Sequence, residues 1–99
     1  MTVSAENFEK IARLVGDPNT PAARPSTRAE KLQLYGLYKR ATVESDQRPQ
    51  RPGMFNIDGR MKWDAWAAED GKSKEEAMQA YVDLAKELVG KAVEDVLAE

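Results

Sequence analysis

The chain has 99 residues, which is enough for one small domain with a single modest core. Its content of 41% hydrophobic and 32% charged residues is that of a globular protein rather than a disordered chain, and no apolar run approaches the ~20 residues that span a bilayer. Cysteine and histidine are both absent, which excludes disulfides, thiolate metal sites and a Ser-His triad and makes the cytoplasm the expected location.

The positive charge is concentrated in the middle of the chain. Residues 28–62 hold eight basic and four acidic residues, a net charge of +4, whereas residues 64–99 hold four basic and ten acidic residues, a net charge of −6. A basic centre in an acidic protein indicates a local anion site, although ordinary surface charge would give the same pattern. The overall pI of 5.3 argues against nucleic acid as a partner.

The first predicted helix spans about residues 4–15. Ser4 is a suitable N-cap, and apolar residues then recur at spacings of three and four, namely Phe8, Ile11, Ala12 and Val15. Gly16 fits the end of this helix. Residues 16–26 contain three prolines and no periodicity, so they are predicted to form a loop. This loop is too short to join two domains, and one domain covering residues 1–99 is expected.

The second helix is predicted to begin after Thr27, which forms a capping box with Glu30. One face of this helix carries Leu34, Leu37 and Ala41, and the adjacent face carries Tyr35, Tyr38, Lys39 and Thr42. The periodicity then lapses from Val43 to Ile57, where two prolines and a glycine indicate a connection. Asp58 is the predicted cap of a third helix, at about residues 59–70, in which Trp63 and Trp66 are expected to be core anchors.

The last part of the chain is predicted to be one long helix. Ser73 and Glu76 form a second capping box, and an apolar stripe follows at residues 77, 81, 84, 85, 88, 92 and 96. The helix should run from about residue 74 to beyond residue 88, weakened at Gly90. Because no segment alternates with a period of two, the sequence predicts an all-α fold of four helices.

A tyrosine and a lysine on the second helix form the clearest candidate site. Tyr35 and Lys39 are four residues apart and therefore share a helix face, where a phenol beside an ammonium group would suit a phosphate. Lys62 would converge on the same anion if the second and third helices pack side by side. The ordinary alternative is that the tyrosines belong to the core and the lysines to the solvated surface. The chain has neither a glycine-rich phosphate loop nor metal-ligand spacing.

Four blocks of residues resemble the acyl-CoA-binding protein family. They are Tyr35-x-x-Tyr38-Lys39-x-Ala41-Thr42, Arg51-Pro52-Gly53-Met54, Gly59-x-x-Lys62-Trp63-Asp64-Ala65-Trp66 and Ser73-Lys74-Glu75-x-Ala77-Met78-x-x-Tyr81. The resemblance covers residues 34–84 and implies an up-down-down-up four-helix bundle. It implies a monomeric, non-enzymatic carrier that binds, buffers and transports medium- to long-chain fatty acyl-CoA esters, with no cofactor and no stable membrane insertion. The rival interpretation is a protein-interaction module of the same fold with weakened ligand affinity.

The resemblance also assigns ligand contacts to individual residues. Tyr35, Lys39 and Lys62 would surround the ribose 3′-phosphate, Tyr38 would contact the adenine region, and Tyr81 would close the site from the last helix. Phe8 and Ala12 would line the acyl–pantetheine path, and Leu32 and Leu34 the acyl groove. The family usually has a basic residue late in its first helix, where this chain has Gly16. Candidates to replace it are Arg13, Arg24 and Arg28.

Overall fold

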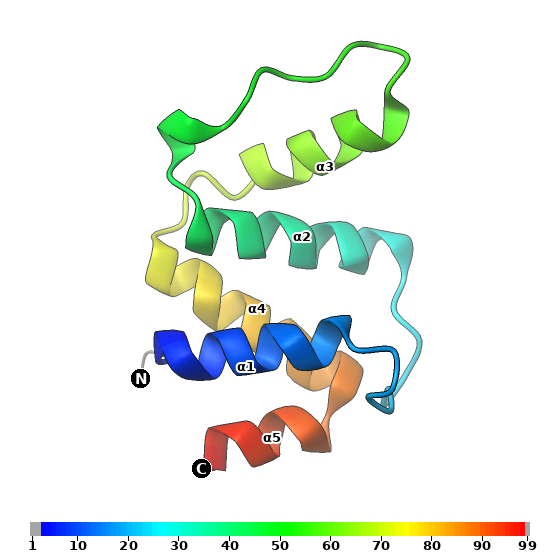
Figure 1. Cartoon of the computed structure of the whole chain (residues 1–99), viewed down its shortest axis with the longest axis vertical. Helices are drawn as coiled ribbons and strands as arrows, with labels where there is room; N and C mark the ends of the chain where they lie inside the picture. Colours follow the sequence, from blue (N-terminus) through cyan, green and yellow to red (C-terminus); the bar gives the residue numbers. More distant parts are fainter. Residues whose placement is uncertain (1–2, 99) are drawn as a thin grey trace.

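The structure, a computed structural model that describes residues 3–98, is all-helical over that range, as predicted. In chain order the elements are α1 (Ala5–Gly16), α2 (Arg28–Thr42), a short 3-10 helix (Ser45–Gln47), α3 (Ile57–Ala67), α4 (Lys74–Val89) and α5 (Lys91–Ala98). Figure 1 shows that α2 runs back against α1, α3 runs in the same direction as α2, and α4 returns. The predicted up-down-down-up order is therefore confirmed, but the described residues form five α-helices where four were expected.

Three of the predicted helix starts are confirmed in detail. The Ser4 hydroxyl accepts a hydrogen bond from the backbone N–H of Asn7 at 3.1 Å and caps α1. Thr27 and Ser73 each form a complete capping box at the starts of α2 and α4. In both boxes the cap hydroxyl and a glutamate three residues later satisfy backbone donors that a helix start otherwise leaves unpaired.

The predicted start of α3 is wrong by two residues. The cap is Asn56, whose side-chain oxygen accepts from the backbone N–H of Gly59 at 3.0 Å, so the helix begins at Ile57. Asp58 instead lies in the first turn and forms an ion pair with Arg28 of α2 at 3.0 Å. The helix also ends earlier than predicted, at Ala67, because turns occupy the residues that follow.

The last predicted helix is divided at Gly90. This glycine has a φ of +72°, a left-handed conformation that side chains with a Cβ rarely adopt, and it ends α4. The chain then reverses, and α5 folds back against α1 and α4 (Figure 1). The apolar periodicity continues across the break because Val93 and Val96 of α5 are buried in the same core as the residues of α4.

Helix α2 is the central element of the bundle and packs against both α3 and α4. The core between α1, α2, α4 and α5 is apolar and contains Phe8, Ile11, Leu34, Leu37, Ala77, Tyr81, Val82, Leu84, Ala85, Leu88, Val93 and Val96. On its other side, α2 approaches α3 closely at Gly36, where an added Cβ would lie only 2.7 Å from the carbonyl carbon of Ala65. This contact sets how α2 and α3 sit side by side.

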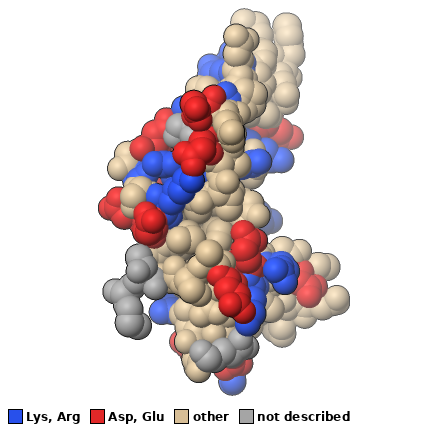
Figure 2. All heavy atoms as spheres, turned by 60° about the vertical axis from the view of Figure 1, so that its left-hand side comes forward, with Lys and Arg blue, Asp and Glu red and all other residues tan. Residues whose placement is uncertain are grey.

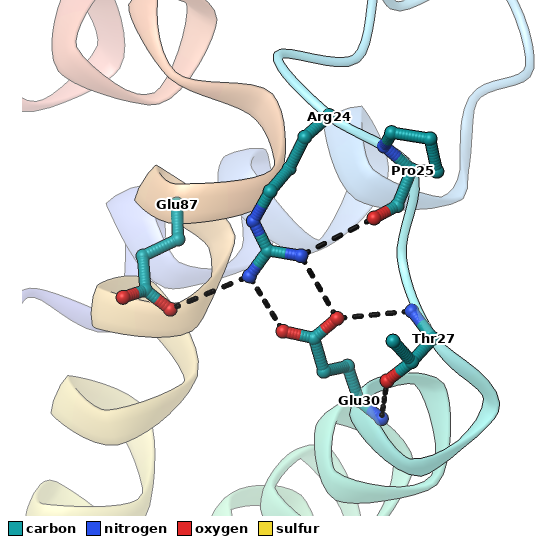
Figure 3. Close-up of polar contacts among 5 residues, drawn as sticks. All are labelled: Arg24, Pro25, Thr27, Glu30 and Glu87. Atoms are coloured by element: carbon teal, nitrogen blue, oxygen red, sulfur yellow. Dashed lines mark hydrogen bonds and ion pairs between the residues drawn. The ribbon is translucent and has the colours of Figure 1, made fainter.

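The α1–α2 loop is fixed to the bundle by Arg24 (Figure 3). The Arg24 guanidinium donates two hydrogen bonds to the carboxylate of Glu30, at 3.0 and 2.6 Å, and lies 3.8 Å from Glu87 of α4. The backbone N–H of Ala23 also donates to the carbonyl of Leu88 at 2.8 Å. Hydrogen bonds from Arg24 and from the Thr27 backbone together lower the pKa of Glu30 to about 2.

Over the described residues, no helix is both long and apolar enough to cross a membrane.

Candidate functional site

The side-by-side packing of α2 and α3 brings the predicted tyrosine and lysines together. The ammonium nitrogen of Lys39 lies 5.9 Å from the centre of the Tyr35 ring, and that of Lys62 lies 5.7 Å from the same ring. Lys39 also lies 5.7 Å from the Trp66 ring, which is buried between the helices. One lysine comes from each helix, so the Tyr35 ring is flanked by two positive charges.

These positive charges have no acidic partners within residues 3–98. Neither Lys39 nor Lys62 forms an ion pair there, and the same holds for Lys31 and Arg13 nearby. Arg28, Arg48 and Arg51 of the basic segment are each paired with an aspartate, for example Arg51 with Asp64 at 2.8 Å. Like charges held close together repel, and a bound anion would remove that repulsion. The unpaired cations therefore indicate an anion site around Tyr35.

An open hollow of about 440 Å³ lies between α1, α2 and α4, next to Tyr35. Tyr38 and Tyr81 line it together with Ala12, Val15 and Leu34, so its surface is mainly apolar and aromatic; Glu9, Arg13, Lys31 and Tyr35 complete the lining. Burial raises the pKa of the Tyr81 phenol to about 12, with smaller contributions from Tyr38 and Glu9. The hydroxyl is protonated at neutral pH, as an ordinary phenol is, and can donate a hydrogen bond.

Phe8 lies beneath this hollow and is not part of its lining. Its side chain is 2% exposed, stacks on the Tyr38 ring at 5.7 Å and meets the Tyr81 ring edge-on at 5.3 Å. Such aromatic pairs add stability beyond the area they bury. Phe8 therefore holds the two tyrosines in place, although the family resemblance implied that it would line the ligand path itself.

A second hollow lies on the other side of Tyr35, between α2 and α3. It measures about 200 Å³ and is lined by Arg28, Lys31, Leu32, Tyr35, Asp58, Met61 and Lys62. Leu32 and Met61 also line a larger, mostly apolar hollow of about 450 Å³ farther along the same two helices. Leu32 and Leu34 consequently face opposite sides of α2 and do not line one common groove, although both were expected in the acyl groove.

Lys31 is a further candidate site residue, which the motifs of the sequence did not single out. It lines the hollows on both sides of Tyr35, and it has no ion pair within the described residues. Its signal was available, because Lys31 is four residues before Tyr35 and therefore lies one turn away on the same face of α2.

The three candidates for the missing basic residue differ in their surroundings. Arg24 is engaged by Glu30 and Glu87, and Arg28 is paired with Asp58. Arg13 lines the first hollow without an ion partner among residues 3–98. Gly16 ends α1, and nothing lies within 4 Å of a Cβ built on it. Arg13 is therefore the one of the three that is placed to meet a ligand in this hollow.

The bundle with its cationic, aromatic-lined hollows has the features of a small binding protein, and comparison with known proteins defines its class. Residues 5–85 match the family model described as acyl CoA binding protein. The chain is 55% identical to the acyl-CoA-binding protein of Ricinus communis over 67 residues. This alignment covers 68% of the chain and 73% of the Ricinus protein.

Two crystal structures resemble the whole fold. One is acyl-CoA-binding protein 2 of Oryza sativa, with a TM-score of 0.73 and 46% identity over 88% of this chain and 91% of that one. The other is the ACBP of Moniliophthora perniciosa, with a TM-score of 0.76 and 30% identity over 99% of this chain and 95% of that one. The chain belongs to the acyl-CoA-binding protein family.

Proposed function

We propose that the protein binds medium- to long-chain fatty acyl-CoA esters and buffers and transports them, as a monomer in the cytoplasm. The observation that carries this proposal is the group of unpaired cations around Tyr35, set between a largely apolar hollow on one side and a smaller, more polar one on the other. A CoA ester has the matching chemistry, because it combines several phosphates, a planar base and a long hydrocarbon chain in one molecule.

The head group would be held around Tyr35. Lys39 and Lys62 would bind the ribose 3′-phosphate, with the Tyr35 hydroxyl as a further donor, and Lys31 would meet the remaining phosphates. Hydrogen bonds to charged groups contribute roughly 1.5–3 kcal/mol each, so three such contacts supply much of a micromolar affinity. The first hollow would receive the adenine, since its surface is aromatic and Tyr38 and Tyr81 both line it.

The acyl chain would follow the other hollow, from Lys62 past Leu32 and Met61 along the α2–α3 seam. This path begins beside the phosphate-binding lysines and becomes more apolar with distance from them. Each buried methylene contributes ~0.8 kcal/mol, so two additional carbons should tighten binding about tenfold until the hollow is filled. Ala12 and Leu34 remain available to the pantetheine arm in the first hollow.

We propose further that the bound thioester is carried and not cleaved. The chain has no histidine or cysteine to serve as base or nucleophile, and the Tyr81 phenol, with a pKa of about 12, is a poor nucleophile at neutral pH. Incubation of palmitoyl-CoA with purified protein should leave the thioester intact. Steady release of free thiol at a rate proportional to protein concentration would refute the carrier function and indicate an enzyme.

The phosphate assignment is tested by removing one lysine at a time. Lys39→Ala and Lys62→Ala should each weaken binding of palmitoyl-CoA by roughly tenfold or more and weaken binding of its 3′-dephospho analogue much less. Lys86→Ala, which removes an exposed lysine of α4, is the matched control and should bind like the wild type. An equal loss for both ligands would remove the 3′-phosphate assignment, and no binding by the wild type would favour a protein-interaction module.

A further inference from the structure

An exposed apolar tip lies at one end of the molecule. Three large apolar side chains face solvent where the connection meets α3: Met54 is 68% exposed, Phe55 94% and Ile57, the first residue of the helix, 66%. Figure 1 places this connection at one extremity of the long axis, and Figure 2 shows that the same end is largely uncharged at its outermost point. A cluster of large exposed apolar side chains usually marks an interaction site.

The tip is held up by contacts at its base. The Arg60 guanidinium donates to the carbonyl of Pro52 at 2.9 Å, and the Trp63 indole donates to the carbonyl of Pro49 at 2.7 Å. Arg51 makes two hydrogen bonds to Asp64, at 3.0 and 2.8 Å. The connection is therefore anchored to α3 just before the tip, and the chain enters α3 directly after it, yet Met54, Phe55 and Ile57 remain exposed.

The charge that surrounds the tip is positive. The two carboxylates of α3 are both neutralised, Asp58 by Arg28 and Asp64 by Arg51. Arg60 and Lys62 of the same helix have no ion pair within the described residues, so a net positive charge remains beside the apolar side chains. Apolar side chains next to uncompensated cations fit a surface that is apolar inside and anionic outside.

We propose that the tip inserts reversibly into the surface of an anionic lipid bilayer and so brings the ligand site to the membrane. This inference rests on the proposed function, because a long-chain acyl-CoA is an amphiphile that partitions into bilayers. The hollow that contains Asp58, Met61 and Lys62 begins within one or two turns of Ile57. Docking at the tip therefore places the opening of the acyl path close to the lipid from which an ester would be taken.

A flotation assay tests the proposal with the full chain. The wild type should float with phosphatidylcholine vesicles that contain about 30 mol% phosphatidylserine, and much less with phosphatidylcholine alone. Phe55→Ser should reduce the vesicle affinity by about tenfold, since it removes the most exposed apolar side chain of the tip. Gln50→Ser, in the same connection, is the matched control and should leave the affinity unchanged. Equal flotation of the wild type and Phe55→Ser would overturn the proposal.

A single-site reporter distinguishes insertion from other uses of the tip. Because the chain has no cysteine, Met54→Cys can be labelled uniquely with an environment-sensitive fluorophore, with Lys86→Cys as the control site. Vesicles should shift the emission to the blue at position 54 only. An emission maximum at position 54 that vesicles leave unchanged would refute the membrane role. Concentration-dependent dimers that Phe55→Ser abolishes would also refute it, and would identify the tip as a protein–protein interface.

Solution titrations separate this proposal from the function on which it rests. Phe55→Ser should bind palmitoyl-CoA in the absence of vesicles as tightly as the wild type, while it removes the ester from loaded vesicles more slowly. Normal vesicle binding by a wild type that does not bind palmitoyl-CoA would refute the carrier function and leave only the docking surface. Normal solution binding without any vesicle association would refute the docking surface alone.

Discussion

Gly36→Ala should damage both the stability and the ligand site, because Gly36 is where α2 and α3 come closest. A Cβ at this position would lie 2.7 Å from the carbonyl carbon of Ala65, closer still to its oxygen, and 3.2 Å from the backbone nitrogen of Trp66. Since all three are backbone atoms of α3, no side chain can rotate away to make room. The helices must move apart.

The magnitude follows from two opposing effects. Overpacking of this kind costs ~1–3 kcal/mol, and replacement of a helical glycine by alanine returns ~0.5–1 kcal/mol. The difference spans ~0–2.5 kcal/mol, and because the contact is with rigid backbone we expect a loss of roughly 1–2 kcal/mol, which would lower the melting temperature of a domain of this size by roughly 4 to 16 °C. The affinity for palmitoyl-CoA should also fall, because Tyr35 and Lys39 lie on α2 and Lys62 lies on α3.

Urea unfolding and calorimetric titration measure the two effects separately. Gly16→Ala is the matched control, since nothing lies within 4 Å of a Cβ at the end of α1. That variant should be as stable as the wild type or slightly more stable, with unchanged affinity. A Gly36→Ala protein with wild-type stability and wild-type affinity would refute the inference that close α2–α3 contact assembles the site.

Three further predictions follow from single residues. Gly16→Lys should tighten palmitoyl-CoA binding by several-fold in calorimetry, because it adds a cation beside Arg13 at the end of α1, and an unchanged affinity would mean that the ligand does not reach this end of the hollow. Glu30 has a pKa of about 2 in the folded protein, so its contribution to stability is complete above its ordinary value near 4.5 and is lost as the pH falls toward 2. Between pH 4.5 and 2 the free energy of unfolding should therefore fall less steeply for Glu30→Gln than for the wild type. The control Glu94→Gln should show the same pH dependence as the wild type. Tyr81→Phe should leave stability within about 1 kcal/mol and weaken palmitoyl-CoA binding by roughly 0.5–1.5 kcal/mol through the lost hydrogen bond, and an undiminished affinity would remove Tyr81 from the ligand contacts.

The helix pattern could be predicted from the sequence where local chemistry determines it. The capping boxes at Thr27 and Ser73 are short-range motifs, and the structure confirms both starts. The start of α3 was missed because Asn56 and Asp58 are both acceptable caps; in the structure Asn56 caps the helix and Asp58 pairs with Arg28 of α2. Gly90 was predicted to weaken the last helix, but the separate helix α5 was missed because the apolar periodicity of α4 continues into it.

The candidate site divides in the same way. Tyr35 and Lys39 share a face through helix geometry alone, so their proximity could be predicted, and Lys62 joins them only through the packing of α2 on α3. Sequence could not separate Phe8, which supports the hollow from below, from Ala12, which lines it, because both lie on the apolar face of α1. Which arginines remain unpaired is also a tertiary property: Arg24 is engaged by residues of two helices (Figure 3).

Calorimetric titration of one protein preparation with palmitoyl-CoA, CoA and palmitate tests the central claim most directly. We expect palmitoyl-CoA to bind with one site per chain and far more tightly than either fragment, because the cations around Tyr35 hold the head group while the α2–α3 hollow holds the chain. Shortening the acyl chain by two carbons should weaken binding about tenfold. Equal binding of palmitate and palmitoyl-CoA, or no heat with any acyl-CoA, would contradict the proposed function.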